Sequence, residues 1–360
     1  MTRDAAVTSS TAGLATPPGG IVGSGRPPMR YTVDGWDPAY GVSLELEEFL
    51  QESSAYVVVD LELPASGWHP IDVRTDIPSP EAMLFVDGVR RIEARVWIDS
   101  PEDAEGASGP AADATAALCA SYAAGVVCCC RHQAHLVTAE LRRGLFSIAP
   151  HASDINTRAG KYQAHHVSGS TTGVPLMARL SQALQRRLAD VEVVAAAAAR
   201  SAIHDHSMPV DDNLLIIDGP LRGRQHLPRA LGYIKSHLST YLPPELNALV
   251  GRLTPGQRTP VFLMGTSWER HSWYLRLPGP PGSPWAGIVR VECAADLPAT
   301  EVIRLANLSQ STLGRFASVA YKDSRAPQNL YPIGGLEREL RHRLGDPQLL
   351  YRALREAAVG

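Results

Sequence analysis

Residues 83–88 read MLFVDG and residues 214–219 read LLIIDG, so two apolar runs end in the same Asp-Gly pair. Both runs have the length and the branched or aromatic composition of a buried β-strand. Asp87 and Asp218 therefore stand where a buried strand leaves the core. Two acids in that position within one chain need an explanation.

Asp-Gly is also the preferred pair for a two-residue turn between antiparallel strands. That explanation suits Asp87, because residues 91–98 (RIEARVWI) follow with the near-alternating polarity of a second strand. It suits Asp218 poorly, because the PLRGRQHLPRAL that follows has no strand pattern. The sequence leaves a hairpin turn open for Asp87 and favours a functional acid at Asp218.

Outside these two stretches, strand-like runs come first and helical segments are interleaved later. The predicted strands are residues 56–63, 83–86, 91–98, 121–130, 213–217, 260–264, 272–277 and 287–293. The predicted helices are residues 175–203, the sequence after the second Asp-Gly pair through Tyr241, residues 299–318, and two short C-terminal helices separated by Gly345, Asp346 and Pro347. The first strands are expected to form an antiparallel meander. The whole order predicts an α/β fold, a mixed sheet flanked by helices.

A carboxylate interrupts the apolar face of the helix predicted at residues 175–203. Leu176, Leu180, Leu184 and Leu188 form a row with i, i+4 spacing, and Glu192 is the next member of that row. An acid at that position reaches water, pairs with a cation or binds a metal ion. The sequence leaves these three explanations open.

Asp87, Glu192 and Asp218 are the residue types needed for metal-assisted cleavage of phosphodiesters. Their hard oxygen atoms suit Mg²⁺ or Mn²⁺. Two such ions about 4 Å apart activate a water molecule and stabilise the leaving oxygen. Scattered acids are common on any protein surface, so the argument depends on where these three stand.

Length and composition indicate a globular protein. The 360 residues are 44% hydrophobic, which suffices for one large core or two smaller ones. A formal net charge of -3 excludes a polycation that coats nucleic acid, so any DNA contact needs a local basic patch. Residues 1–30 are expected to form a disordered tail before one domain at residues 31–360, and residues 100–112 a surface loop. Without a signal-peptide pattern or a membrane-spanning run, we expect a cytoplasmic protein.

Basic residues follow Asp218 closely. Arg222, Arg224 and Arg229 lie in the segment directly after it, and Lys235 comes soon afterwards. They form either a phosphate-binding patch or an ordinary solvated helix face, and charge alone favours neither.

Three cysteines are consecutive in the apolar run at residues 125–130, namely Cys128, Cys129 and Cys130. Neighbouring side chains on a strand point to opposite faces, so these three cannot converge on one metal ion. We interpret them as buried small hydrophobic residues.

Four segments occur in a fixed order: FVDGVRRIEARVW, LLIIDGPL, GYIKSH and a final YP before a helix, with the Glu192 helix between the first two. This combination resembles the NurA family of nucleases, from residue 83 to the end of the chain. The resemblance implies an RNase H-like fold, a homodimer, Mn²⁺ as cofactor, and action on DNA ends with a HerA-type hexameric ATPase. It also implies that Asp87, Glu192 and Asp218 bind metal and that Lys235 contacts the scissile phosphate or the attacking water. The chain has no GxxxxGK[ST] phosphate-binding loop, so the ATPase would be a separate protein.

The resemblance implies a histidine on the helix after the YP motif, but here Tyr331-Pro332 is followed by Ile-Gly-Gly-Leu-Glu. Helical geometry favours Glu337 as the substitute, because it lies about 20° from Leu344 of the buried stripe. His342 points to nearly the opposite side. We therefore expect Glu337 to be the fourth metal-facing group.

The sequence thus predicts a metal-dependent deoxyribonuclease that processes DNA ends, in repair or in anti-phage defence. The predicted metal ligands for Mn²⁺ or Mg²⁺ are Asp87, Glu192, Asp218 and Glu337, with Lys235 as a further catalytic residue and Arg222, Arg224 and Arg229 binding DNA. Two alternatives remain: a catalytically silent DNA-binding or scaffold subunit of an ATPase complex, and an RNase H-like enzyme that acts on RNA. Metal-dependent cleavage of labelled DNA and RNA distinguishes the three.

Overall fold

The computed structural model describes residues 55–99, 114–130, 133–169, 173–205, 212–237, 240–280, 282 and 284–359. The tail predicted at residues 1–30 and the loop predicted at residues 100–112 lie outside these ranges. All of the described residues belong to one compact unit. None of the helices in the described ranges is both long and apolar enough to span a lipid bilayer.

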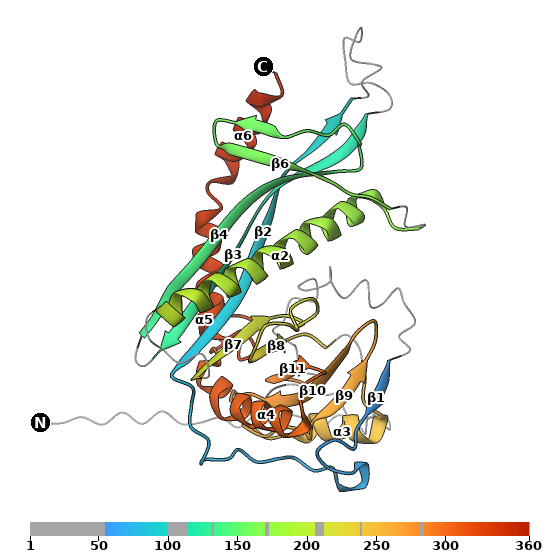
Figure 1. The fold of residues 1–360 in the computed structure, drawn as a ribbon, viewed down its shortest axis with the longest axis vertical. Coiled ribbons are helices and arrows are strands. Elements are labelled where there is room, and N and C mark those ends of the chain that lie inside the picture. The colour runs from blue at the N-terminus through green and yellow to red at the C-terminus, as the bar shows by residue number, and fades with distance from the viewer. Residues whose placement is uncertain are drawn as a thin grey trace, which may run out of the picture. The chain divides into compact units, whose positions relative to one another are not determined.

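The described strands form one 11-stranded mixed sheet in the order β1-β9-β10-β11-β8-β7-β2-β3-β4-β6-β5 (Figure 1). The strands are β1 (Tyr56–Val58), β2 (Ala82–Ile98), β3 (Thr115–Cys130), β4 (Gln133–Ser147), β5 (Ile155–Thr157), β6 (Gly160–His166), β7 (Asn213–Asp218), β8 (Ala230–Ile234), β9 (Phe262–Gly265), β10 (Glu269–Arg276) and β11 (Ile288–Ala294). The pairs β2–β7, β7–β8 and β4–β6 are parallel, and the other pairs are antiparallel. The predicted mixed sheet with flanking helices is confirmed.

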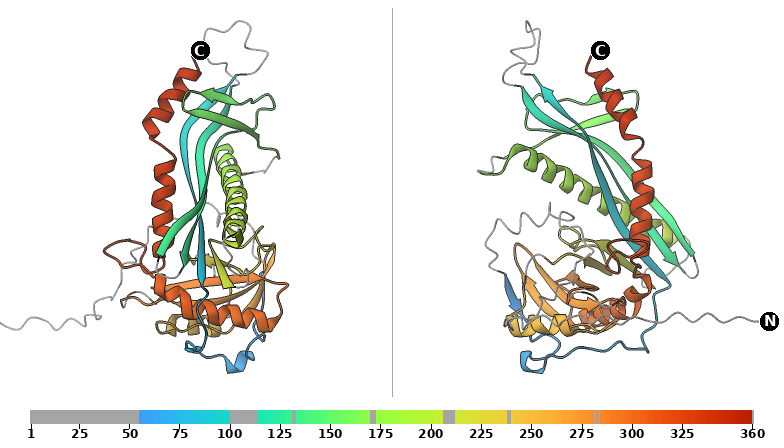
Figure 2. Two further views of the ribbon diagram at one scale, coloured as in Figure 1. Left: turned by 60° about the vertical axis from the view of Figure 1, so that its left-hand side comes forward. Right: turned by 180° about the vertical axis from the view of Figure 1, so that it is seen from behind.

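Helices cover both faces of the long strands β2, β3 and β4. The helices are α2 (Leu176–Asp205), α3 (Pro244–Arg252), α4 (Ala299–Leu313), α5 (Tyr331–Arg343) and α6 (Pro347–Ala357). The apolar face of α2 packs on one side of these strands, and α5 packs on the other (Figure 2). Alternation along the strands explains this division, because successive side chains of β3 enter cores on opposite faces.

The strand that carries the first Asp-Gly pair is continuous. β2 is 17 residues long and runs straight through Asp87 and Gly88, each of which is paired with β3. The hairpin turn left open for Asp87 is therefore wrong, and the two strands predicted at residues 83–86 and 91–98 are one. An antiparallel meander is present, but it consists of β2, β3 and β4. The predicted first strand, β1, pairs with β9 at the other edge of the sheet instead.

The helix predicted after Asp218 is also wrong at its centre. Residues 230–234 (ALGYI) form β8, which lies parallel to β7 and is buried along its whole length. A five-residue apolar run shows no period that separates a buried strand from a buried helix. β8 has no hairpin signal before it because a parallel partner needs a crossover rather than a tight turn.

The two C-terminal helices begin and end as their sequence predicts. Gly345, which follows α5, has a φ of 87°. A glycine in this left-handed region ends many helices. The side chain of Asp346 accepts hydrogen bonds from the backbone N–H groups of Gln348 and Leu349, which caps α6. Buried residues of α5, among them Leu336 and Leu340, then pack against Val89 and Ala123 of the sheet.

Replacing Leu340 by alanine should lower the free energy of unfolding by about 2–5 kcal/mol, because the side chain is fully buried between α5 and the sheet. Denaturant unfolding followed by circular dichroism measures this loss. Leu349→Ala is the matched control, since Leu349 is 54% exposed on α6 and should change stability by less than about 0.5 kcal/mol. Equal losses in the two variants would contradict the placement of α5 on the core.

Candidate active site

Three carboxylates meet at the point where β2 and β7 lie side by side. Oxygen atoms of Asp87, Asp218 and Glu337 all lie within 4.8 Å of one another. Asp87 is 8% exposed and Glu337 is 6% exposed, so the cluster is largely removed from water. Three like charges at this spacing repel one another strongly unless protons or cations reduce their charge.

The register of the sheet brings the two aspartates together. Val86 of β2 is paired with Ile217 of β7 in the parallel ladder, so the next residues, Asp87 and Asp218, stand opposite each other. Phe85 and Ile216, each two residues before one of the aspartates, enter the core on the side of α4. Because side chains alternate along a strand, both aspartates face that side as well.

Lys235 supplies a positive charge to the cluster. It comes directly after β8, the strand next to β7, and its Nζ lies 2.5 Å from Asp218 Oδ2. The same Nζ donates a hydrogen bond to Asn329 Oδ1 at 3.0 Å. The lysine is thus fixed between a carboxylate and an amide, both mostly buried, and its position does not depend on solvent.

Glu337 reaches the cluster from α5, and Arg325 holds it there. Arg325 donates two hydrogen bonds to the carboxylate, Nη1 to Oε1 at 2.8 Å and Nη2 to Oε2 at 2.7 Å. Such a two-pronged contact fixes the plane of the carboxylate as well as its position. His342, the residue that the sequence argument rejected, is exposed on the same helix.

The segment before α5 contains site residues that the sequence analysis missed. Asp323 accepts hydrogen bonds from Asn329 at 2.6 Å and from Arg325, so it orients the partners of both Lys235 and Glu337. Asn329 is fully buried. The available signal was a run of polar residues shortly before the YP motif, but their partners lie directly after β8 and on α5, which no local pattern reveals.

Glu192 approaches the cluster from the opposite face of the sheet. A Cβ atom added at Gly88 would lie 2.6 Å from Glu192 Oε1, so the helix carboxylate rests against the backbone next to Asp87. Its other oxygen forms a buried ion pair with Arg224. Glu192 is therefore close to Asp87 but stands outside the group of three, and the expected convergence of Asp87, Glu192 and Asp218 is only partly seen.

The arginines predicted to bind DNA occupy three different environments. Arg222 is exposed in the loop that joins β7 to β8. Arg224 is 7% exposed and is bound to Glu192 and to the carbonyl of Pro220. Arg229 donates to the carbonyl of Asn213, at the opposite end of β7 from Asp218. Of the three, Arg222 alone is exposed, and it follows Asp218 by four residues in the chain.

The loop after Asp218 is tied to a buried glutamate on β11. Glu292 is fully buried, and its Oε1 accepts a hydrogen bond from the backbone N–H of Leu221 at 2.7 Å. Arg270 of the adjacent β10 lies 3.2 Å from the other oxygen. This contact fixes the start of the loop that carries Arg222 and Arg224.

Burial and mutual repulsion shift the proton affinities of the cluster. Burial raises the pKa of Asp87 well above its ordinary value, and the Asp218 and Glu337 carboxylates raise it further while Lys235 opposes them. Burial also raises the pKa of Asp218 despite the adjacent lysine. Burial alone would lower the pKa of Lys235, but the Asp218 and Asp87 carboxylates outweigh it and raise that pKa.

One carboxylate oxygen of the cluster has no hydrogen-bond partner in the part of the chain that the structure describes. Asp87 Oδ1 accepts a hydrogen bond from the N–H of Gly88, whereas Oδ2 is buried without a hydrogen-bond partner among the described residues. A buried carboxylate oxygen without a partner is costly, and functional sites are where such groups concentrate.

No family model matches the chain, and no curated protein matches it. Among solved structures, the crystal structure of the NurA nuclease from Sulfolobus solfataricus is similar at 9% sequence identity with a TM-score of 0.40. That match covers 87% of this chain and 93% of the other.

Replacing Asp87 by asparagine should stabilise the protein in the absence of divalent ions. The native state holds the Asp87 proton to a higher pH than the unfolded chain, whose carboxyl has a pKa of about 3.9. The unfolded state therefore binds fewer protons above that pH, and the wild type loses stability as pH rises towards the native pKa. Asp87→Asn removes this loss.

Melting temperatures in EDTA at a series of pH values between 4 and 8 measure the effect. The variant should melt above the wild type at pH 8, and the difference should shrink towards pH 4. Asp190→Asn, at an exposed acid on α2, should follow the wild-type curve. A variant that melts below the wild type at pH 8 would contradict the repulsion described for this cluster.

Proposed function

We propose that this protein is a metal-dependent deoxyribonuclease that hydrolyses phosphodiester bonds at the Asp87–Asp218–Glu337 cluster. The observation that carries the proposal is the convergence of three largely buried carboxylates within 4.8 Å, with a lysine fixed against one of them. Without a bound cation this arrangement costs folding free energy, because each acid is removed from water and placed beside another acid. Such a cost is expected where the acids serve to bind a ligand.

The residues present fit a divalent cation. The donor set consists of carboxylate oxygens, which Mg²⁺ and Mn²⁺ prefer. The unpartnered Oδ2 of Asp87 supplies a lone pair that the described residues leave unused. Asp87, Asp218 and Glu337 would hold one or two ions, which when bound help to activate a water molecule and stabilise the leaving oxygen.

The remaining residues of the site would orient substrate and ligands. Lys235 Nζ would offer its third proton to a phosphate oxygen, since two are taken by Asp218 and Asn329. Arg325 would keep the Glu337 carboxylate turned towards the aspartates. Glu192 would hold Arg224, and with it the loop that carries Arg222, rather than bind metal itself.

The strand arrangement around the cluster supports an RNase H-like core. Within the sheet, the neighbours β4, β3 and β2 are antiparallel, and β7 and β8 follow on the other side of β2 and run parallel to it. The helix α2 connects β6 to β7, between the two groups of strands. Asp87 lies on β2 and Asp218 is the last residue of β7, and these are two of the positions at which the NurA resemblance implies metal ligands.

DNA cleavage by the purified protein with Mn²⁺ or Mg²⁺ tests the proposal directly. Asp87→Asn, Asp218→Asn and Glu337→Gln should each reduce the rate by more than about 100-fold, since loss of a group behind a ligand already costs 10–100-fold. Gel assays on labelled linear DNA, with EDTA as the blank, give the rates. His342→Ala is the matched control for Glu337→Gln and should cleave normally, because it lies exposed on the same helix.

The same assay distinguishes the alternatives. Cleavage of RNA or RNA–DNA hybrids but not of DNA would identify an RNase H-like enzyme with a different substrate. DNA binding without cleavage of any substrate would indicate a silent binding subunit. Full activity in Glu337→Gln together with its loss in His342→Ala would contradict the assignment of the third carboxylate.

The resemblance of the sequence to the NurA family also supports a proposal about partners. A homodimer would act on DNA ends beside a HerA-type hexameric ATPase, since the chain itself has no phosphate-binding loop. The setting would be DNA repair or anti-phage defence. Light scattering should give twice the mass of one chain if the dimer forms.

A HerA-type ATPase from the same genome should co-elute with this protein in size-exclusion chromatography and accelerate DNA cleavage only when ATP is present. Asp218→Asn should keep the complex while losing cleavage, which separates assembly from chemistry. Separate elution at micromolar concentrations would remove the ATPase from the proposal and leave the nuclease assignment untouched.

A further inference from the structure

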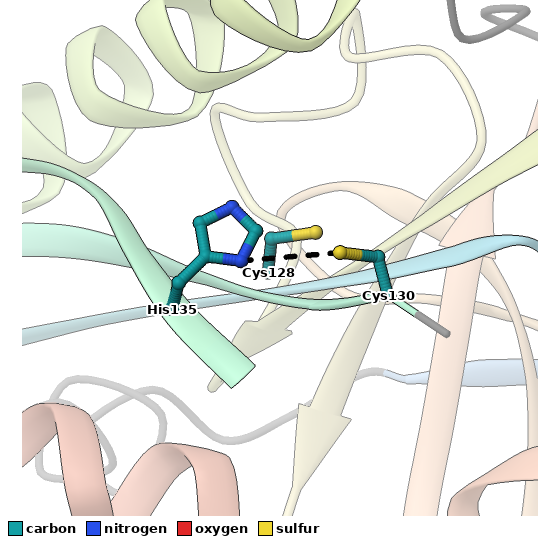
Figure 3. Close-up of side chains that lie close together, drawn as sticks. All are labelled: Cys128, Cys130 and His135. Carbon is teal, nitrogen blue, oxygen red and sulfur yellow. Dashed lines mark hydrogen bonds between the residues drawn. The ribbon is translucent and has the colours of Figure 1, made fainter. Parts of the chain in front are cut away.

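A second group of potential metal ligands lies where β3 ends and β4 begins. Cys128 and Cys130 of β3 and His135 of β4 turn towards one another (Figure 3). One ligand atom from each lies within 4.8 Å of the other two, and Cys130 Sγ is 3.9 Å from His135 Nδ1. These residues belong to no part of the proposed nuclease site.

The sheet register creates this group. Cys128 and Cys130 are two residues apart on one strand, so their side chains share a face, while Cys129 points to the other. His135 is paired directly with Cys128. An irregularity between Val126 and Val127 sets that pairing, since an unbroken register would place the next β4 residue, Leu136, opposite Cys128.

This geometry corrects the interpretation of the cysteines from sequence. Adjacent cysteines on a strand cannot share a metal ion, but the outer two of a run of three can. The histidine that completes the group lies on β4, a strand that the sequence did not predict. Cys129, on the opposite face, packs against the core beneath α4.

The donor set selects a thiophilic cation. Two sulfur atoms and an imidazole nitrogen match Zn²⁺, which binds sulfur at about 2.3 Å and nitrogen at about 2.0–2.1 Å. Tetrahedral ligands at those lengths are separated by about 3.5–3.8 Å, so the present spacing needs only small side-chain rotations. Hard ions such as Mg²⁺ and Mn²⁺ prefer the carboxylate cluster instead.

Burial at the site leaves one side open. Cys128 is 1% exposed and packs in the core beneath α2, whereas Cys130 is partly exposed and His135 is exposed. Three protein ligands with a solvent-facing side leave room for water in a fourth position. A disulfide is the competing use of two thiols, but Cα atoms two residues apart on a strand lie about 6.6 Å apart, near the limit that a disulfide spans.

We propose that Cys128, Cys130 and His135 bind one Zn²⁺ ion, with the fourth coordination position open to solvent. The ion would join the ends of β3 and β4. Because β3 pairs with β2 at Leu84 and Cys128, the joined hairpin is the one that supports the strand carrying Asp87. The proposal does not rest on the nuclease assignment.

Cobalt substitution of the reduced, tag-free full chain tests the site without an activity measurement. The experiment uses Asp87→Asn as the background, which weakens ion binding at the carboxylate cluster, and the sulfur-to-cobalt band reports only on thiolate ligands. Titration with Co²⁺ should produce a sulfur-to-cobalt charge-transfer band that saturates at one ion per chain, and one equivalent of Zn²⁺ should abolish it. Elemental analysis after dialysis should find one zinc per chain.

Variants assign the ligands. Cys130→Ser and His135→Ala should each weaken zinc binding at least about 10-fold, whereas Cys129→Ser, the neighbouring thiol on the opposite face, should bind as the background does. Circular dichroism confirms folding of each variant, which is expected because Cys130 and His135 lie towards solvent.

Three outcomes would overturn the proposal. These are the absence of a charge-transfer band, a band that survives both Cys130→Ser and His135→Ala, and a Cys128–Cys130 disulfide found by peptide mass in protein kept under reducing conditions.

Discussion

The parallel pairing of β2 with β7 is the contact on which the rest of the molecule depends. Its register, Val86 opposite Ile217, decides that Asp87 and Asp218 face each other and that both face the same side of the sheet. A shift by one residue would turn one of the two aspartates into the apolar core beneath α2. The antiparallel β3 and the parallel β8 then extend the sheet on either side, and β8 carries Lys235 to the same place.

The site also shows how a chain maintains an acidic cluster inside a fold. Among the residues that the structure describes, each of the four acids except Asp87 forms an ion pair with its own cation: Lys235 with Asp218, Arg325 with Glu337 and Arg224 with Glu192. Removing any of these cations would leave a buried charge uncompensated, which costs more stability than replacing both partners by apolar residues. The exception, Asp87, has a carboxylate oxygen within 4.8 Å of those of Asp218 and Glu337, so a cation bound there would meet all three carboxylates.

Much of this arrangement was accessible from sequence, because its signals are local. Three features can be seen within a single strand or helix. They are the two apolar runs ending in Asp-Gly, the helix row that reaches Glu192, and the placement of Glu337 on the buried side of its helix. The features that the sequence did not reveal depend on which strands and which side chains pair in the fold. β8 is too short and too uniformly apolar to show a period, and Arg325 and Asn329 acquire their meaning only from partners on other elements. The same holds for His135, which a register irregularity places across from a cysteine.

Gly88 has a consequence that extends through the sheet. A side chain there would meet Glu192 at 2.6 Å and Leu188 at 2.7 Å, so the missing Cβ lets α2 lie directly on the backbone of β2. Only that backbone lies between the ion pair on one face and the carboxylates on the other. Burial raises the pKa of Asp87, and Glu192 is one of the three acids that raise it further while Lys235 lowers it. Burial likewise raises the pKa of Glu192, and Asp218 raises it further while Arg224 lowers it. The sheet is a single layer of backbone at this point, so a cation bound on one face would lower the pKa of the acids on the other and release their protons.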